Sequence, residues 1–401
     1  MKKFLALILA LVMALSLVAC GEKTPAGGDD AAKLKVGIVL VGDENEGYTA
    51  AHMDGIKAAA AACGLADENL VWCYNIPENE ECYDKCVECV EQGCNVVITN
   101  SYSHQTYTQQ AAEENPNVQF VAMTGDTAMK SGLKNFHNAF NYTFESRYVS
   151  GIVAGMKLKE LMDAGKVTDP YIGYVGAYPY AEVVSGYTGF FLGIKSIVPE
   201  AHMDVQYTNS WFNIQDEGKA AEALMSRGCV IIGQHADSTG APKAVQTAKD
   251  NGQVVYSVGY NVDMLKAAPT AALTSASNNW SVFYTYLFNA MLNGEEVKTD
   301  WAAGYNEGAV CITELGPEVA EGTAEAVAAA EKAIKAGELH VFDTANFTVG
   351  GQPVTSAFTF DSDGDWANDT NEGIVDGYYH ESEYISAPSF SLRIDGITEL
   401  N

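Results

Sequence analysis

The stretch Leu34-Lys35-Val36-Gly37-Ile38-Val39-Leu40-Val41 decides the fold class when it is taken with the residues that follow it. It is a short and almost continuous apolar run, which is typical of a strand buried on both faces of a sheet. Residues 49–62 have the composition of a helix, and residues 70–74 form a second apolar run. This order of strand, helix and strand predicts a βαβ unit, and therefore a parallel sheet with helices on both faces.

The same alternation continues along the chain in two blocks. The first block is expected to add helices at 78–92 and 104–114 and strands at 95–99 and 118–123. The second block is expected to contain helices at 147–164, 180–197, 215–227 and 241–251 and strands at 171–175, 203–208, 229–233 and 254–258. Each block can build a complete sheet, and about 380 residues are too many for one ordinary core. The fold class is therefore α/β, with two doubly wound parallel-sheet lobes.

Residues 1–19 have the pattern of a secretory signal peptide. Lys2 and Lys3 precede an apolar run from residue 4 to residue 18, which is shorter than the roughly 20 residues that span a membrane. The sequence Leu17-Val18-Ala19-Cys20 resembles the bacterial lipobox, in which cleavage precedes the cysteine and a diacylglycerol is attached to its sulfur. We expect lipidation of Cys20, with residues 20–33 as a flexible leash to the outer face of the cell membrane. The alternative is an ordinary signal peptide with an incidental Cys20.

The charge balance excludes nucleic acid as a partner. Removal of residues 1–19 takes Lys2 and Lys3 from the 23 basic residues, which leaves 21 against 52 acidic residues and a balance of −31. Such a surface repels nucleic acid and anionic lipid headgroups and keeps an extracytoplasmic protein soluble. It also argues against a highly anionic ligand.

The cysteines suggest a disulfide framework until their positions are considered. Cys82, Cys86 and Cys89 lie four and three residues apart in a predicted helix, so they share one face of it. Side chains on successive turns of one helix are badly placed to bridge one another. We expect these thiols to pack in the core as small apolar groups, with a metal site that includes Cys94, or a disulfide, as the alternatives.

The loops at the carboxyl ends of the predicted strands are rich in aromatic and amide side chains. Ligands of open α/β sheets bind at these ends. The loops in question are 42–48, 100–102, 124–126, 176–178, 209–213, 234–238 and 259–263. They bring together Tyr48, Ser101, Tyr102, Tyr178, Trp211, Phe212 and Tyr260 with Asn100, Asn209, Asp237, Asn261 and Asp263. Aromatic faces with a few amides and carboxylates suit a flat, polar, uncharged ligand such as a nucleoside, a nucleobase or a sugar.

No catalytic motif competes with this interpretation. The sequence has no G-x-S-x-G, H-E-x-x-H or P-loop and no intact G-x-G-x-x-G after a strand. His235, Asp237 and Ser238 could be read as a hydrolytic group, but residues so close in one loop rarely form a line of nucleophile, base and orienting group. We therefore expect a binding protein without catalytic residues, cofactor or metal.

At these loops the chain resembles the basic membrane protein family, the purine-nucleoside-binding-like lipoproteins of ABC importers. Glu46-Gly47-Tyr48-Thr49-Ala50-Ala51-His52 is similar to its G-W-T-x-x-H segment, with tyrosine in place of the more usual tryptophan. Further similar segments follow in order over residues 35–342, at 146–155, 172–176, 209–212, 234–238, 259–264, 273–275, 279–280 and 303–305. Their collinearity carries more weight than any one motif.

The resemblance implies a type I periplasmic-binding-protein fold with two lobes and a three-crossing hinge. It also implies a nucleoside or purine-like ligand between aromatic residues, a monomer, and delivery to an ABC permease and its ATPase. The residues it places at the site are Tyr48, Trp211, Asp237, Asn261, Asp263 and Asn279, with Asn261 where an acidic residue is common. The expected lobes are 34–142 plus 271–304 and 143–270 plus 305–342, with hinge crossings near 140–145, 269–272 and 302–306. A ligand-sensing lipoprotein of the same fold and a nucleoside hydrolase are the alternative functions.

Residues 343–401 depart from the family pattern and are expected to form an extension that packs on a lobe. Asp361-Ser362-Asp363-Gly364-Asp365, with Asp369 and Glu372, resembles an EF-hand calcium loop. Trp366 stands where that loop needs glycine, so a solvated acidic turn is the favoured interpretation.

Overall fold

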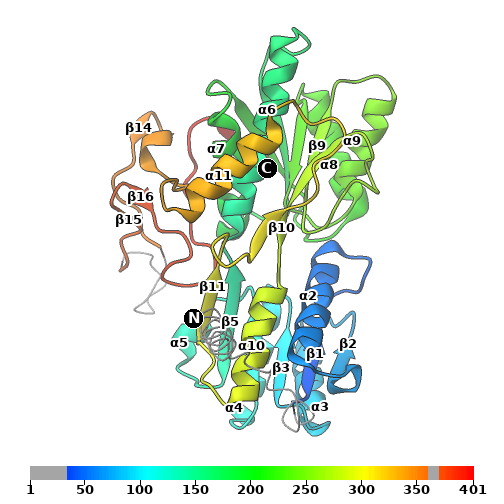
Figure 1. Ribbon diagram of the computed structural model, residues 1–401, viewed down its shortest axis with the longest axis vertical. Coiled ribbons are helices and arrows are strands. Elements are labelled where there is room, and N and C mark those ends of the chain that lie inside the picture. Colours follow the sequence, from blue (N-terminus) through cyan, green and yellow to red (C-terminus); the bar gives the residue numbers. More distant parts are fainter. Residues whose placement is uncertain (1–33, 360–369) are drawn as a thin grey trace, which may run out of the picture.

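Two α/β lobes, one above the other in Figure 1, make up most of the computed structural model, which describes residues 34–359 and 370–401. In the first lobe all neighbouring strands are parallel, which agrees with the βαβ prediction. Their order is β11 (Asp300–Ala303), β5 (Phe136–Asn141), β4 (Gln119–Met123), β3 (Val96–Thr99), β1 (Val36–Val39) and β2 (Leu70–Cys73). The apolar run at 36–39 forms the buried strand β1, in which Val36 lies opposite Leu70 on one side and Val96 on the other.

Helices cover both faces of the first sheet. α2 (Gly47–Cys63) and α10 (Ser281–Asn293) pack together on one face, and α3 (Glu80–Glu91) and α4 (Gln105–Glu114) on the other. The short helix α5 (Ala128–Ser131) precedes β5.

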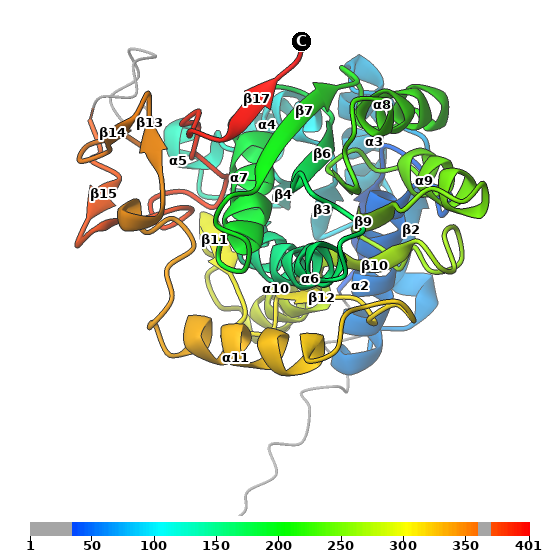
Figure 2. The same cartoon turned by 90° about the horizontal axis from the view of Figure 1, so that it is seen from above.

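The second lobe repeats this plan around a larger sheet. Its strand order is β12 (Val310–Ile312), β10 (Ala272–Asn278), β9 (Tyr256–Tyr260), β8 (Ile231–Gln234), β6 (Tyr171–Gly176), β7 (His202–Tyr207) and β17 (Ile397–Glu399). Only β12 is antiparallel to its neighbour among these described strands. Figure 2 shows α6 (Thr143–Asp163) and α7 (Ala181–Lys195) on one face and α8 (Ile214–Ser226) and α9 (Gly240–Asp250) on the other, with α11 (Thr323–Lys335) outside α6.

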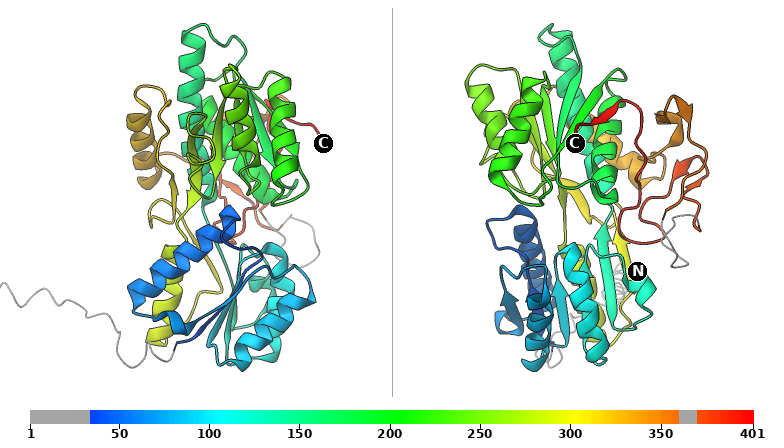
Figure 3. Two further views of the ribbon diagram at one scale, coloured as in Figure 1. Left: turned by 90° about the vertical axis from the view of Figure 1, so that its right-hand side faces the viewer. Right: turned by 180° about the vertical axis from the view of Figure 1, so that it is seen from behind.

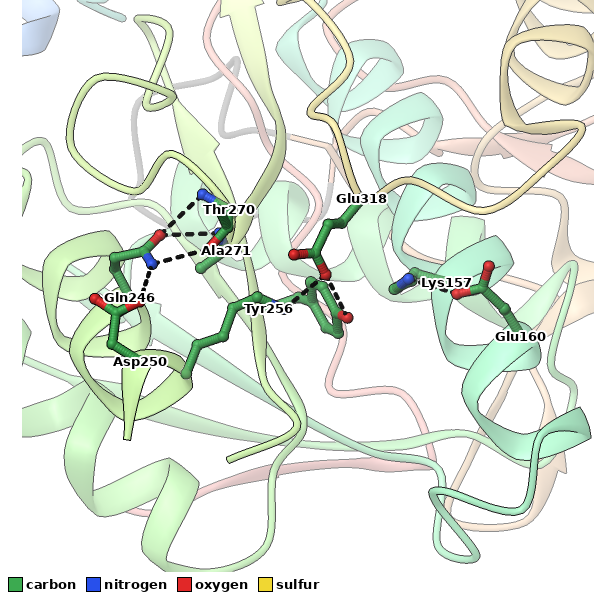
Figure 4. Close-up of polar contacts among 9 residues, drawn as sticks. Lys157, Glu160, Gln246, Asp250, Tyr256, Thr270, Ala271 and Glu318 are labelled. Atoms are coloured by element: carbon green, nitrogen blue, oxygen red, sulfur yellow. Dashed lines mark hydrogen bonds and ion pairs between the residues drawn. The ribbon is translucent and has the colours of Figure 1, made fainter. Parts of the chain in front are cut away.

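The assignment of residues 271–278 to the first lobe was wrong. β10 pairs in parallel with β9, so Ala272–Asn278 belongs to the second sheet. Figure 4 shows how the turn before it is held: the Gln246 Oε1 atom of α9 accepts hydrogen bonds of 3.0 Å from the backbone N–H groups of Thr270 and Ala271. The second crossing therefore follows β10, at Asn279 and Trp280, and not at 269–272. An apolar strand pattern does not tell which of two sheets the strand joins.

The strand β5 was missed at the sequence level because half of it is polar. All six residues of Phe136–Asn141 are buried. Asn138 belongs there because its amide bonds to the backbone: Nδ2 donates to the Ala122 carbonyl at 3.0 Å, and Oδ1 accepts from the Ala128 N–H at 2.6 Å. Buried polar groups are tolerated when they are bonded in this way, and no apolar periodicity marks such a strand.

The chain passes between the lobes three times within the described residues, and one buried amide joins all three crossings. Asn141, at the first crossing, donates from Nδ2 to the Asn278 Oδ1 atom at 3.2 Å and to the Ala309 carbonyl at 2.9 Å. Asn278 ends β10 before the second crossing, and Ala309 lies in the third. Glu145 adds a further link, because its carboxylate accepts from the Tyr305 N–H at 2.7 Å.

The cysteines of α3 are core residues, as predicted. Cys82, Cys86 and Cys89 are free and buried against the first sheet, and Cys94 joins the same cluster. No group of three or more histidine, cysteine or acidic residues in the described ranges could hold a metal ion. The acidic turn at 361–369 lies outside those ranges.

In its described residues, the C-terminal extension contains two short hairpins and the strand β17. β13 (Thr348–Val349) pairs with β14 (Gln352–Pro353), and β15 (Ile374–Val375) with β16 (Tyr378–Tyr379). Figure 3 shows this part of the chain beside the second lobe, near the level where the lobes meet. It is anchored there by stacking of Phe342 on Phe390, with ring centroids 4.2 Å apart, and by addition of β17 to β7.

Two glycines allow α6 and α7 to approach closely. A Cβ atom at Gly151 would lie 2.1 Å from the carbonyl oxygen of Phe190, and one at Gly193 would lie 2.1 Å from that of Tyr148. No side chain fits at these points, so the helices can pack only with glycine at both.

We predict that Gly151→Ala lowers the free energy of unfolding by about 1–3 kcal/mol, because the added methyl must separate the two helices. Urea unfolding checks this. Gly218→Ala is the matched control, since its Cβ would have no neighbour nearer than 3.6 Å and alanine favours a helix. Equal unfolding midpoints for Gly151→Ala and the wild type would contradict the prediction.

Candidate functional site

The carboxyl ends of both sheets face one another across a cavity of about 560 Å³ between the lobes. Each wall segment lies at the carboxyl end of a strand or shortly after it, which is why segments distant in sequence meet there. The first lobe contributes Val41, Gly42, Asp43, Asn45, Glu46, Tyr48, Asn75, Glu78, Ser101, Tyr102 and Thr124. The second lobe contributes Tyr178, Glu182, Ser210, Trp211, Phe212, His235, Asp237 and Tyr260.

Aromatic rings of the wall belong to one cluster, in which Tyr180 lies behind the wall residues. Tyr178 stacks on Tyr180 with centroids 5.0 Å apart, and Trp211 meets Tyr178 edge-on at 5.2 Å. Tyr102 reaches this group from the first lobe, 6.5 Å from Tyr180. These rings offer both faces and edges to a flat ligand.

Backbone and hydroxyl groups hold the polar residues of the first lobe in place. The Tyr48 hydroxyl donates to the carbonyl of Asn100, whose side-chain Oδ1 accepts from the Val41 N–H at 2.8 Å. Glu46 precedes α2 and accepts from the Thr49 hydroxyl. The loops after β1 and β3 are thus linked at the start of α2.

In the second lobe the polar residues are more deeply buried. Asp237 is only 6% exposed, and its Oδ1 accepts from the Asn261 Nδ2 atom at 2.6 Å. Burial raises the pKa of Asp237 well above its usual range. His235 Nε2 lies 3.1 Å from the Glu182 Oε1 atom, and burial, with the nearby Arg147, lowers the pKa of His235 to about 4. His235 is therefore neutral at pH 7.

A buried arginine supports the floor of the cavity. The Arg147 guanidinium lies 3.6 Å from the centroid of the Tyr260 ring, and its Nη1 donates to the Gln234 carbonyl at 2.6 Å. Tyr260 separates this charge from the cavity, because Tyr260 is on the wall and Arg147 is not.

The structure brings six of the nine predicted site residues to this cavity. They are Tyr48, Ser101, Tyr102, Trp211, Phe212 and Asp237. The other three line a second hollow between α2 and the loops after β9 and β10. There Asn261 supports Asp237 from behind, Asp263 accepts from the Leu265 N–H at 2.8 Å, and Asn279 donates to the Gly308 carbonyl at 3.0 Å.

Several wall residues were not predicted from sequence. Asn75 and Glu78 lie in the loop after β2. This loop was not among the seven predicted ligand loops, although it too follows the carboxyl end of a strand. Glu182 stands in the first turn of α7, just beyond the loop after β6. His235 lies in one of the predicted loops, 234–238, but was not among the predicted ligand-binding residues.

The hydrolytic reading of His235, Asp237 and Ser238 has no support in the geometry. The Asp237 carboxylate bonds to Asn261 and His235 faces Glu182. Ser238 Oγ accepts from the Gly240 N–H at 3.0 Å, at the start of α9. The three side chains thus have separate partners.

Comparison with known proteins agrees with this geometry. Residues 33–344 match the Bmp family model, described as ABC transporter substrate-binding protein PnrA-like. The chain belongs to this family. Bmp proteins bind their ligands without catalysis, on the extracytoplasmic side, and act with an ABC permease and ATPase. No helix in the described part of this Bmp protein is long and apolar enough to cross a membrane.

Its relatives differ in the ligands that their names give. A purine-binding protein of Brucella abortus is 31% identical over 314 residues, which cover 77% of this chain and 83% of that protein. A putative ABC transporter glucose-binding protein of Haloferax volcanii is 30% identical over 247 residues, or 62% of this chain and 59% of that one. The solved structure of an ABC solute-binding protein from Conexibacter woesei has a TM-score of 0.62 at 18% identity and covers 77% of this chain and 98% of its own, which shows the common fold.

We predict that acidification destabilises the protein partly through His235. Its pKa is lower in the folded state than its ordinary value of 6.5, so stability is complete above about pH 6.5 and is lost as the pH falls toward 4, by up to about 1.4 kcal/mol per pH unit. His235→Gln should therefore lose less stability between pH 7 and pH 5 in urea unfolding.

The comparison between variant and wild type isolates this effect. Buried carboxyl groups such as Glu217, whose pKa burial raises to about 7, change stability in the opposite direction in both proteins. His202→Gln is the control, because the His202 side chain, on β7, is 42% exposed and lies outside the cavity wall. If the free energy of unfolding changes with pH in the same way in His235→Gln and in the wild type, His235 does not contribute to the acid destabilisation.

Proposed function

We propose that this Bmp protein captures a nucleoside or a similar purine-like molecule for an ABC importer. The observation that carries the proposal is the wall of the cavity, where aromatic rings and hydrogen-bonding side chains from both lobes face the same space. A flat ring would stack on Trp211 and its aromatic neighbours, and carboxylates would accept hydrogen bonds from hydroxyl or amino groups. The name of the Brucella abortus relative supports a purine.

A sugar is the second candidate, and the relative named as a putative glucose-binding protein favours it. Sugars also use carboxylates for their hydroxyl groups and aromatic faces for their C–H groups. The two candidates differ in how much flat surface they need, and the aromatic group of the second lobe, Tyr178, Tyr180 and Trp211, favours a purine.

We also propose that the lobes close on the ligand. Neither lobe alone supplies the whole wall, since Tyr48 and Tyr102 come from one side and Trp211 and Asp237 from the other. A ligand that contacts both sets binds the closed form preferentially and shifts the population toward it. The protein would act as a monomer held to the membrane by the lipid on Cys20, which lies outside the described residues.

We predict that Trp211→Ala weakens binding of the preferred purine nucleoside by roughly one to two powers of ten, because a stacked aromatic contributes about 1–3 kcal/mol. Isothermal titration calorimetry with adenosine, guanosine and inosine, and with glucose as the rival, checks this. Trp211→Phe should keep most of the affinity because it keeps a ring face.

Tyr384→Ala is the control outside the cavity, since Tyr384 is 45% exposed in the extension. Binding of glucose alone would replace the purine proposal with the sugar one. Unchanged nucleoside affinity in Trp211→Ala would remove the stacking role of Trp211.

We predict that Cys20→Ala abolishes lipid attachment. The variant should be released into the medium or remain with its signal peptide uncleaved, because the thiol that receives the lipid is absent. Fractionation of cells and mass spectrometry of the mature N-terminus check this. Normal processing with unchanged membrane association would rule out the anchor.

A further inference from the structure

The cavity wall carries an excess of acidic groups. Within the described residues it includes five carboxyl groups and no lysine or arginine. The five are Asp43, Glu46 and Glu78 from the first lobe and Glu182 and Asp237 from the second. In a shared, partly desolvated space the ionised form of each group is costly without a counter-charge, and burial accordingly raises the pKa of Glu46 and of Asp237.

The neighbours of these carboxyl groups do not supply that charge. Glu46 accepts from the Thr49 hydroxyl and Glu78 from the Ser101 hydroxyl, and both donors are neutral. His235, the partner of Glu182, is neutral at pH 7 for the reason given above. Asp43 bonds to the N–H and the side chain of Asn45.

Arg147, a cation behind the wall, is turned away from the cavity. Arg147 stacks beneath Tyr260 and donates to a backbone carbonyl. Its Nε and Nη2 atoms have no hydrogen-bond partner among the described residues. One cation behind a ring offsets only part of five carboxyl groups.

Asp237 shows where a ligand would complete the site. Its Oδ1 is bonded to Asn261, whereas no hydrogen bond from a described residue reaches its Oδ2. Asp237 is more than nine-tenths buried and stands on the cavity wall. Across the cavity, Glu46 raises the cost of a second negative charge. A positively charged group between the two lobes would stabilise the ionised form of both Asp237 and Glu46.

The aromatic rings in the same wall favour the same kind of ligand. Tyr48, Tyr102, Tyr178, Trp211 and Tyr260 all line the cavity. The negative face of an aromatic ring attracts a cation, and the attraction grows when water is excluded. Rings and carboxylates together recognise a flat cation, because both attract its positive charge, whereas a neutral ring gains only stacking from the rings and hydrogen bonds from the carboxylates.

We propose that this cavity selects a heteroaromatic ligand with a positive charge, such as a protonated or N-alkylated ring, over neutral and anionic molecules of the same shape. The inference deepens the proposed function and rests on it only for the shape of the ring. A phosphorylated ligand would add negative charge to five carboxyl groups and is rejected.

Two matched pairs of probes test charge separately from shape. The first pair is 1-methyladenosine, a cation at pH 7, and its neutral isomer N6-methyladenosine. The second is 1-methylnicotinamide, a fixed cation, and neutral nicotinamide, which contain no purine. Calorimetry at pH 7 should show each cation binding at least about tenfold more tightly than its neutral partner, and adenosine monophosphate more weakly than adenosine.

Single neutral variants assign the effect to the wall. Glu46→Gln and Asp237→Asn should each reduce the preference for the cation by about threefold to tenfold, with little change for the neutral partner. Glu44→Gln is the matched control, because Glu44 is an exposed neighbour that does not line the cavity. Circular dichroism and melting temperature establish that each variant is folded.

The outcomes separate this inference from the proposed function. If the cation and its neutral partner bind equally in both pairs, and Glu46→Gln changes neither affinity, selection by charge is wrong and a purine ligand stands. If 1-methylnicotinamide binds and no purine does, the purine proposal is wrong and selection by charge stands. Failure of both cations to bind, or binding of adenosine monophosphate as tight as that of adenosine, overturns selection by charge.

Discussion

The geometry of the molecule depends on the side-chain amide of Asn141. It is fully buried where the chain leaves the first lobe, and its Nδ2 bonds to the end of β10 and to the third crossing. Thr143 adds a bond of 2.9 Å to the same Asn278 Oδ1 atom. The crossings are thus tied into one junction, and both sheets present their carboxyl ends to one space. The cavity follows from this junction, because its wall residues stand on loops that would otherwise be unrelated.

Much of the fold could be predicted from sequence because its core strands are apolar and regular. The runs that became β1, β3 and β6 are bounded by amphipathic helices, and such a pattern has few solutions other than a parallel sheet. The failures share a physical cause. β5 is held by amides such as Asn138 and has no apolar pattern, and β10 belongs to the second sheet because it pairs with β9. Both features depend on contacts between residues distant along the chain, which a local sequence pattern does not reveal.

The sequence predicted the loops of the candidate site better than the individual side chains that line it. The rule that ligands meet the carboxyl ends of strands located Tyr48, Trp211 and Asp237, which line the cavity. It did not tell which side chain of a loop faces the ligand. Asn261 has φ of 62° and its amide turns behind Asp237, whereas Glu182 reaches the wall from the helix beyond its loop. The acidic character of the cavity wall was not predicted, because acidic residues are common throughout this chain and do not mark the site.

The C-terminal extension joins the two lobes at a place other than the three crossings. It lies beyond the residues that match the family, and it contacts both lobes. β17 continues the second sheet, and the Ser386 N–H donates to the Asp300 carboxylate of β11, in the first lobe, at 2.9 Å. The two lobes are therefore joined at two places, at the junction of the three crossings around Asn141 and through the extension at Asp300. A change in the angle between the lobes would have to keep or break the second of these contacts, which the crossings alone would not require.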